Sequence, residues 1–254
     1  MKPLFHGDHL RANLYDRGHD KLIITFDFRS PDKRDFGKDP PSVAFESKGF
    51  AVLRIKTRRN DWFINSETAA LEDCLRQTAR QYDWINLLGY SMGGYAAFRF
   101  ASCVEANAVV AVSPQFSITP KIAPFDPRYW NDSAGFDPVI GDLADRLRPD
   151  QKGIIVVDPF CKPDLIHAHL ITIYAPCVRL ARLAGGGHPA TKVLSEARRG
   201  QILRAVATTF SPDPGPIIAA HRAARAGSAF YLRRLERARR QRVRELPRPL
   251  TDLG

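Results

Sequence analysis

Ser91 lies at the centre of a Gly-x-Ser-x-Gly pattern at residues 89–93. The apolar run 83–91 is typical of a buried strand, and 93–104 is typical of a helix that begins with glycines. A serine at the apex of a sharp strand-to-helix turn is strained, and small residues two positions away let the strand and helix approach each other. The pattern predicts that Ser91 is a nucleophile and that the backbone N–H of Met92 stabilises an oxyanion.

A serine hydroxyl is a weak nucleophile until a base removes its proton. Residues 185–189, Gly-Gly-Gly-His-Pro, follow the last apolar run of the strand pattern, and His188 is the candidate base. The glycines would let this loop fold over the sheet edge toward Ser91, whereas the alternative is a surface histidine. His167 and His169 are two positions apart on a predicted helix and face different directions, so we expect no metal site there.

The third member of such a site is a carboxylate between Ser91 and His188 in the chain. Asp158 lies near the end of the apolar run 153–160, and Asp164 follows six residues later, just before a predicted helix. Asp164 is also a candidate helix N-cap, and Asp158 is also a candidate turn residue before a proline. We favour Asp158 by a small margin and keep Asp164 as the alternative acid.

A second oxyanion donor is expected in the loop after the first parallel strand, which reads Thr-Phe-Asp-Phe-Arg at 25–29. The backbone N–H of Asp27 or Phe28 is the candidate. The Asp27 carboxylate would repel developing negative charge unless it is turned away or neutralised by Arg29.

Short apolar runs alternate with amphipathic stretches along most of the chain, which predicts a mostly parallel sheet flanked by helices. The predicted strands cover 21–28, 50–57, 83–91, 106–114, 153–160 and 177–189. The segment 114–150 breaks the alternation with prolines and aromatic residues, and we interpret it as a cap insertion. A turn-rich stretch at 211–216 predicts a boundary between a domain at 1–210 and a helical, arginine-rich tail at 211–254.

The composition limits the classes of protein. The chain has 254 residues and 44% hydrophobic composition, which suits one main domain. No run is long and apolar enough for a transmembrane helix, and the first twenty residues are polar, so we expect a cytoplasmic protein. The four cysteines lack the spacing of a zinc site or a disulfide framework.

Most of the formal net charge of +11 comes from the tail. Residues 221–248 contain ten arginines against Glu236 and Glu245, a difference of eight charges. An arginine-rich helix is compatible with an anionic partner such as lipid, nucleic acid or another protein. No nucleic-acid-binding motif accompanies it, so nucleic acid is the least favoured of these partners.

The motifs described above, together with Asn60-Asp61-Trp62-Phe63 and Val-Ser-Pro-Gln at 112–115, resemble the α/β-hydrolase superfamily over residues 20–208. Within it the chain looks like a poorly characterised bacterial branch, some members of which are connected with glycan modification. The resemblance implies a nucleophile at Ser91, a base at His188, an eight-stranded sheet and no cofactor. Asn60, Asp61 and Trp62 follow a strand at the edge where ligands collect in such folds, so they are candidate substrate contacts, although Trp62 packing against the cap is equally compatible.

The combined hypothesis is a serine hydrolase that cleaves a carboxylic ester, on a small molecule or a glycan, through an acyl-enzyme. One alternative is transfer of the acyl group to a glycan hydroxyl by the same residues. The other is a non-catalytic binding module whose basic tail recruits an anionic partner.

Overall fold

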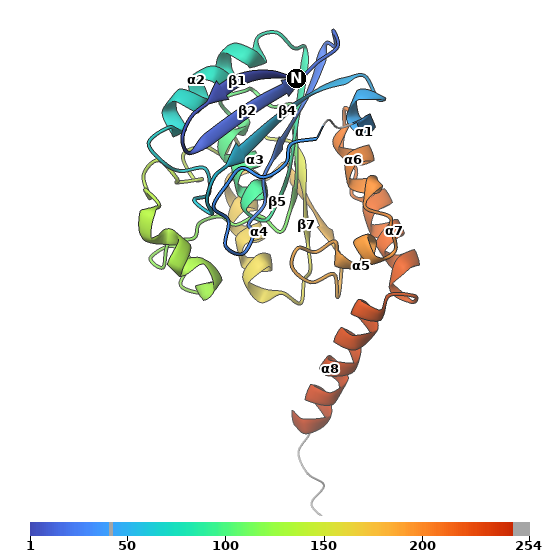
Figure 1. Cartoon of the computed structure of the whole chain (residues 1–254). Coiled ribbons are helices and arrows are strands. Elements are labelled where there is room, and N and C mark those ends of the chain that lie inside the picture. The colour runs from blue at the N-terminus through green and yellow to red at the C-terminus, as the bar shows by residue number, and fades with distance from the viewer. Residues whose placement is uncertain (41–42, 246–254) are drawn as a thin grey trace, which may run out of the picture.

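The computed structural model describes residues 1–40 and 43–245, with side chains to residue 240, and contains one eight-stranded sheet (Figure 1). The strand order is β1-β2-β4-β3-β5-β6-β7-β8, and β2 alone runs antiparallel to the other strands, which confirms the predicted mostly parallel sheet. The strands are β1 (Lys2–His6), β2 (Leu10–Tyr15), β3 (Lys21–Phe26), β4 (Phe50–Thr57), β5 (Trp84–Tyr90), β6 (Ala108–Val112), β7 (Gly153–Val157) and β8 (Val178–Arg182).

Helices cover both faces of the sheet, each over its own hydrophobic core. One face carries α2 (Thr68–Ala79), α3 (Met92–Ala101) and α4 (Lys162–Tyr174). The other carries α1 (Val43–Glu46), α5 (Lys192–Glu196), α6 (Gln201–Ala207) and α7 (Gly215–Arg225). Because β6 and β7 lie between these two layers, every residue in them is buried, as their unbroken apolar sequences predict.

The parallel strands place the candidate functional residues at one edge of the sheet. Ser91 follows β5, Asp158 follows β7, and His188 follows β8. Carboxyl ends of parallel strands lie at the same edge, and α/β folds bind ligands there. Three residues far apart in the sequence therefore end near one another.

The connection from β6 to β7, residues 113–152, contains one 3-10 helix, η1 (Pro127–Gly135), where the sequence predicts a cap. The hydroxyl of Tyr95 donates to the carbonyl of Gly141 at 2.6 Å, and Arg99 Nε donates to the carbonyl of Ile140 at 2.8 Å. Both donors belong to α3, the helix that begins beside Ser91. The connection is therefore fixed to the same helix that follows Ser91, the candidate nucleophile.

The predicted boundary at residue 211 is wrong, because α7 is part of the folded body. Ile217 is fully buried in the core under α5 and α6, and His221 Nε2 lies 3.0 Å from the carbonyl of Ala184. The sequence misled here because a proline- and glycine-rich turn can lie within a domain as well as at its edge. Beyond α7, helix α8 (Ala229–Glu245) leaves the body (Figure 1), and residues 246–254 of the predicted tail lie outside the described residues.

In the part of the chain that the structure describes, no helix is long and apolar enough to cross a membrane. All four cysteines are unpaired, and Cys177 is the most exposed of them.

Candidate active site

Ser91 stands on a strained turn between β5 and α3. Its φ of 51° and ψ of −119° lie outside the regions that L-residues prefer. A side chain at Gly89 would overlap the carbonyl of Gly93, and a Cβ at Gly93 would lie 2.6 Å from the carbonyl oxygen of Asp27. The two glycines are therefore needed for the close approach of strand, helix and β3 loop, as the sequence pattern predicts.

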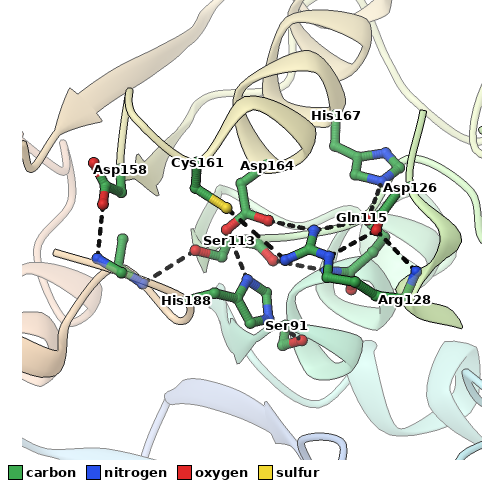
Figure 2. Close-up of polar contacts among 12 residues, drawn as sticks. Ser91, Ser113, Gln115, Asp126, Arg128, Asp158, Cys161, Asp164, His167 and His188 are labelled. Atoms are coloured by element: carbon green, nitrogen blue, oxygen red, sulfur yellow. Dashed lines mark hydrogen bonds and ion pairs between the residues drawn. The ribbon is translucent and has the colours of Figure 1, made fainter. Parts of the chain in front are cut away.

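His188 lies between Ser91 and Asp164 (Figure 2). Its Nε2 is 3.0 Å from Ser91 Oγ, and its Nδ1 is 2.6 Å from Asp164 Oδ2. Asp164 is fully buried in the first turn of α4, and an ionised carboxylate can only accept hydrogen bonds. Nδ1 therefore carries the imidazole proton, which leaves Nε2 with a lone pair directed at the serine hydroxyl.

We favoured Asp158 as the partner of His188, and this prediction is wrong, because Asp164 is the carboxylate that contacts the imidazole. The carboxylate of Asp158 is fully buried and accepts from the backbone N–H groups of Gly185 at 3.0 Å and Gly187 at 2.8 Å. These groups belong to the loop that carries His188, whose ring points away from Asp158 (Figure 2). Asp158 directly follows β7, and from there it reaches the backbone of the neighbouring loop. Asp164 lies in the first turn of α4, which places its carboxylate next to the imidazole.

Arg128, from the cap helix η1, is an unpredicted partner of this site. Its Nη2 donates to Asp164 Oδ1 at 2.6 Å and to Asp126 Oδ2 at 2.7 Å. Burial would raise the pKa of Asp164, but its hydrogen bonds and charge interactions with His188 and Arg128 outweigh burial and lower it. Asp164 therefore stays ionised, and its negative charge is shared between an imidazole and a guanidinium.

A second buried pair, His167 and Asp126, supports Arg128. The N–H of Phe116 donates to His167 Nδ1 at 3.1 Å, so the Nε2–H of His167 faces Asp126 Oδ2, also at 3.1 Å. Burial lowers the pKa of His167, which agrees with a neutral ring. His167 and Asp164 are three residues apart on α4, a spacing that places them on one face and could have indicated this network.

Tyr129 brings a hydroxyl from the cap to Nε2 of His188. This hydroxyl lies 3.0 Å from His188 Nε2, and the ring packs against the fully buried Trp62 with centroids 5.1 Å apart. Burial raises the pKa of Tyr129 to about 12, so the hydroxyl remains a hydrogen-bond donor at neutral pH. No spacing in the sequence indicates Tyr129 or Arg128, because both reach the site only through the path of the cap.

Of the two candidates for the second oxyanion donor, Asp27 and Phe28, only the backbone N–H of Phe28 remains. The N–H of Asp27 donates to the carbonyl of Ile55 at 3.1 Å, because it continues the parallel ladder, so it is unsuited to an oxyanion. The Asp27 carboxylate is paired with Lys33 Nζ at 3.1 Å and Lys56 Nζ at 3.4 Å. Two lysines therefore neutralise this carboxylate, and Arg29, the partner considered from the sequence, does not.

Arg29 instead joins the β3 loop to the cap. Its Nε lies 2.7 Å from Asp132 Oδ2 in η1, and its guanidinium is 5.8 Å from the ring centroid of Tyr129. No pattern in the sequence indicates that Arg29 pairs with the distant Asp132 and not with the nearby Asp27.

The three candidate substrate contacts after β4 make structural interactions. The side chain of Asn60 donates to the carbonyl of Ser30 at 2.8 Å, and Asp61 accepts from Thr57 Oγ1 at 2.6 Å. Burial raises the pKa of Asp61. With Trp62 buried beneath Tyr129, the geometry favours packing against the cap over direct contact with a ligand.

The positions of Ser91, His188 and Asp164 are suited to nucleophilic chemistry. A hydroxyl, an imidazole and a carboxylate in series can generate and stabilise an attacking oxygen. The N–H of Met92, at the first position of α3, has no acceptor within its own helix, so it is available at the same place. Among the residues described, no three His, Cys, Asp or Glu side chains gather as metal ligands.

Comparison with solved structures identifies the architecture. The capsule O-acetyltransferase of Neisseria meningitidis serogroup A has a TM-score of 0.57 and 16% identity, over 79% of this chain and 93% of that one. A sugar hydrolase from Lactococcus lactis has 0.53 and 13%, over 93% and 98%. An acetyl ester-xyloside bifunctional hydrolase from Caldicellulosiruptor lactoaceticus has 0.53 and 13%, over 80% and 92%.

These likenesses, with the eight-stranded sheet, confirm the predicted α/β-hydrolase fold. At such low identity they describe the fold alone, because one fold hosts many functions. No protein-family model and no curated protein sequence matches the chain.

Proposed function

We propose that the protein is a serine hydrolase that cleaves a carboxylic ester through an acyl-enzyme intermediate. The observation that carries the proposal is the continuous series from Ser91 Oγ through His188 to Asp164, with distances of 3.0 Å and 2.6 Å. Both lie within the range in which a base removes a proton from a nucleophile.

In the first step, Ser91 Oγ attacks the ester carbonyl while His188 Nε2 accepts the hydroxyl proton. Asp164 stabilises the imidazolium that forms. When the carbon–oxygen bond to the alcohol breaks, His188 returns the proton to the leaving alcohol. A water molecule then attacks the acyl-serine, with His188 as base again, and releases the acid and free Ser91.

Two backbone N–H groups are proposed to stabilise the oxyanion of the tetrahedral intermediates, those of Met92 and Phe28. Met92 begins α3, so the positive end of the helix dipole adds to its hydrogen bond. The tight packing of Gly93 against the carbonyl of Asp27 keeps the β3 loop beside the start of this helix. Loss of one such donor in other serine enzymes slows catalysis by roughly 10²–10³-fold.

We propose a short acyl group as the part of the substrate that binds beside Ser91. Bulky side chains near the site are buried: Met92, which follows Ser91 in the chain, is 0% exposed, Tyr129, whose hydroxyl contacts His188, is 4% exposed, and Trp62, which packs on Tyr129, is 0% exposed. Two of the similar structures are named for enzymes that act on acetyl groups, an O-acetyltransferase and an acetyl ester-xyloside bifunctional hydrolase. An acetyl ester on a small molecule or a glycan is therefore the preferred substrate class.

The proposal is tested by comparing hydrolysis of p-nitrophenyl acetate and p-nitrophenyl octanoate. Wild-type protein should prefer the acetate. It should also yield, after rapid acid quench, a peptide containing Ser91 with one added acetyl group. Ser91→Ala should abolish both signals, whereas replacement of the exposed Ser195 by Ala should change neither.

Asp164→Asn should lower the rate by about 10⁴-fold, because an amide favours the wrong imidazole tautomer. A folded wild-type protein that releases no p-nitrophenol and forms no acetyl-serine would contradict the proposal. Supplying a sugar as acyl acceptor separates hydrolysis from acyl transfer, because an acetylated sugar forms at the expense of acetate only in transfer.

A further inference from the structure

The first turns of α8 lie against the loop that carries His188. A Cβ at Gly185 would lie 2.7 Å from the ring of Tyr231, and one at Gly187 would lie 2.7 Å from the ring of Phe230. Both glycines have positive φ, 77° and 83°, which suits a loop covered closely by aromatic rings. The root of α8 therefore packs directly on the loop, although the rest of the helix extends away from the body (Figure 1).

Glu196, at the end of α5, fixes where α8 begins. Its Oε2 accepts from Ser228 Oγ and, at 3.2 Å, from the N–H of Phe230. Lys192, in the same short helix, places its ammonium 5.4 Å from the Phe230 ring centroid. These contacts hold the start of α8 at one place on the chain segment that follows His188.

One arginine of α8 reaches into the body from this position. Arg234 Nη2 donates to Asp158 Oδ2 at 3.0 Å, and the Asp158 side chain is fully buried. The same oxygen accepts from the N–H of Gly187, and Oδ1 accepts from Gly185 and Phe160. The guanidinium is the cation of a cluster that otherwise consists of one carboxylate and three backbone N–H groups.

We infer that Arg234 is a positioning residue for His188, acting through Asp158. The inference rests on the proposed function, because it assigns Arg234 to the geometry of the proposed general base. Arg234 stabilises the Asp158 carboxylate, Asp158 holds the backbone on the amino-terminal side of His188, and that backbone sets the distance from the imidazole to Ser91. The arginine-rich helix is thereby connected to the site without touching substrate.

The physical reason is the cost of an unpaired buried charge. A buried carboxylate needs a cation or full hydrogen bonding, and removing one partner of such a pair weakens what the other partner holds. Without Arg234, water or a proton must take the place of the guanidinium at Oδ2, the atom that also binds Gly187. The hydrogen bond to the loop next to His188 should therefore loosen first.

The experiment compares Arg234→Met, Arg234→Lys and Arg237→Met in the full chain. Arg237 is an exposed arginine on the same helix, so its replacement removes the same charge without the contact to Asp158. The first readout is hydrogen–deuterium exchange of the peptide that covers 183–188. The second is the rate at which a fluorophosphonate labels Ser91.

Arg234→Met should accelerate exchange of that peptide and slow labelling roughly tenfold. Arg234→Lys should restore labelling to within about threefold of wild type, because an ammonium supplies the charge without the planar fork. Arg237→Met should match wild type in both readouts. Asp158→Asn should slow labelling at least as much, and Arg234→Met should add nothing to it, because both act on one interaction.

Unchanged exchange of 183–188 in a folded Arg234→Met protein would overturn the inference, as would equal effects of Arg237→Met or additive effects with Asp158→Asn. The exchange readout does not need activity. Failure of wild-type protein to be labelled would contradict the proposed function, whereas faster exchange in Arg234→Met alone would still support the connection between α8 and the His188 loop.

Discussion

The hydroxyl of Tyr129 lies 3.0 Å from His188 Nε2, the same nitrogen that lies 3.0 Å from Ser91 Oγ. A neutral imidazole with its proton on Nδ1 has one lone pair on Nε2. Two hydroxyl donors therefore compete for one acceptor when no substrate is bound. The cap tyrosine therefore competes with Ser91 for the nitrogen that is proposed as the general base.

Tyr129→Phe tests this competition while keeping the ring that packs on Trp62. Because a single hydrogen bond contributes about 0.5–1.5 kcal/mol, its removal should raise the fluorophosphonate labelling rate of Ser91 by roughly 2- to 12-fold. Labelling under pseudo-first-order conditions measures the change. A decrease of more than tenfold would instead indicate that the tyrosine hydroxyl assists the reaction.

Arg128→Met should move the acidic limb of the pH–rate profile to higher pH by about one unit. In the wild-type protein, Arg128 forms an ion pair with Asp164 and so partly neutralises its charge. Without it, Asp164 stabilises the protonated imidazole more strongly, so the inactive form persists to higher pH. Arg29→Met is the matched control, since it removes a cap ion pair, to Asp132, that does not involve Asp164. A limb that stays in place for Arg128→Met would show that Arg128 only anchors the cap.

Gly93→Ala should reduce both activity and stability. The new Cβ would lie 2.6 Å from the carbonyl oxygen of Asp27 and 3.0 Å from that of Phe26, so the β3 loop must move away from α3. Overpacking of this kind costs about 1–3 kcal/mol and would separate the two proposed oxyanion donors. Urea denaturation and the esterase rate measure the two effects. Gly200→Ala, where no atom lies within 4 Å of the new Cβ, should be neutral in both.

The buried His167 should make the protein lose stability on mild acidification. Burial lowers its pKa from the unfolded value of 6.5, so between the folded and unfolded pKa values the unfolded chain binds the extra proton. The free energy of unfolding therefore falls as pH drops below about 6.5, by at most about 1.4 kcal/mol per pH unit for this group. His221, whose pKa burial also lowers, adds to the slope.

Urea denaturation between pH 7.5 and 5 measures this dependence. The slope, not the absolute stability, should be smaller in His167→Gln than in wild type. Equal slopes would contradict the assignment of a neutral buried His167. Below about pH 4, Asp126 and Asp164 should cause a further loss, because their lowered pKa values leave them ionised in the folded state while the unfolded chain takes up protons.

Local sequence pattern was sufficient for the elements that form locally. The elbow at Ser91 follows from glycines two residues on either side, and the mostly parallel sheet follows from apolar runs of strand length. His188 could be predicted as the candidate base because the expected fold places a base after its last strand. These features depend on neighbours in the chain or on chain order.

Features that depend on long-range packing could not be predicted from the sequence. The choice between Asp158 and Asp164 turns on which carboxylate α4 carries over the imidazole, and spacing alone does not specify that. Arg128 and Tyr129 reach the site through an irregular cap, which has no periodicity from which to infer positions. Arg234 lies 76 residues from Asp158 in the chain. An anionic partner for the outer part of α8 stays a prediction.

The most direct test of the account is covalent labelling with a fluorophosphonate probe, read by peptide mass spectrometry on wild-type protein, Ser91→Ala and His188→Ala. The account predicts one labelled peptide, containing Ser91, in wild type. It predicts no label in Ser91→Ala, and labelling slowed by several orders of magnitude in a folded His188→Ala protein. Equal labelling of wild type and His188→Ala, or no labelling of folded wild type, would contradict the claim that His188 activates Ser91.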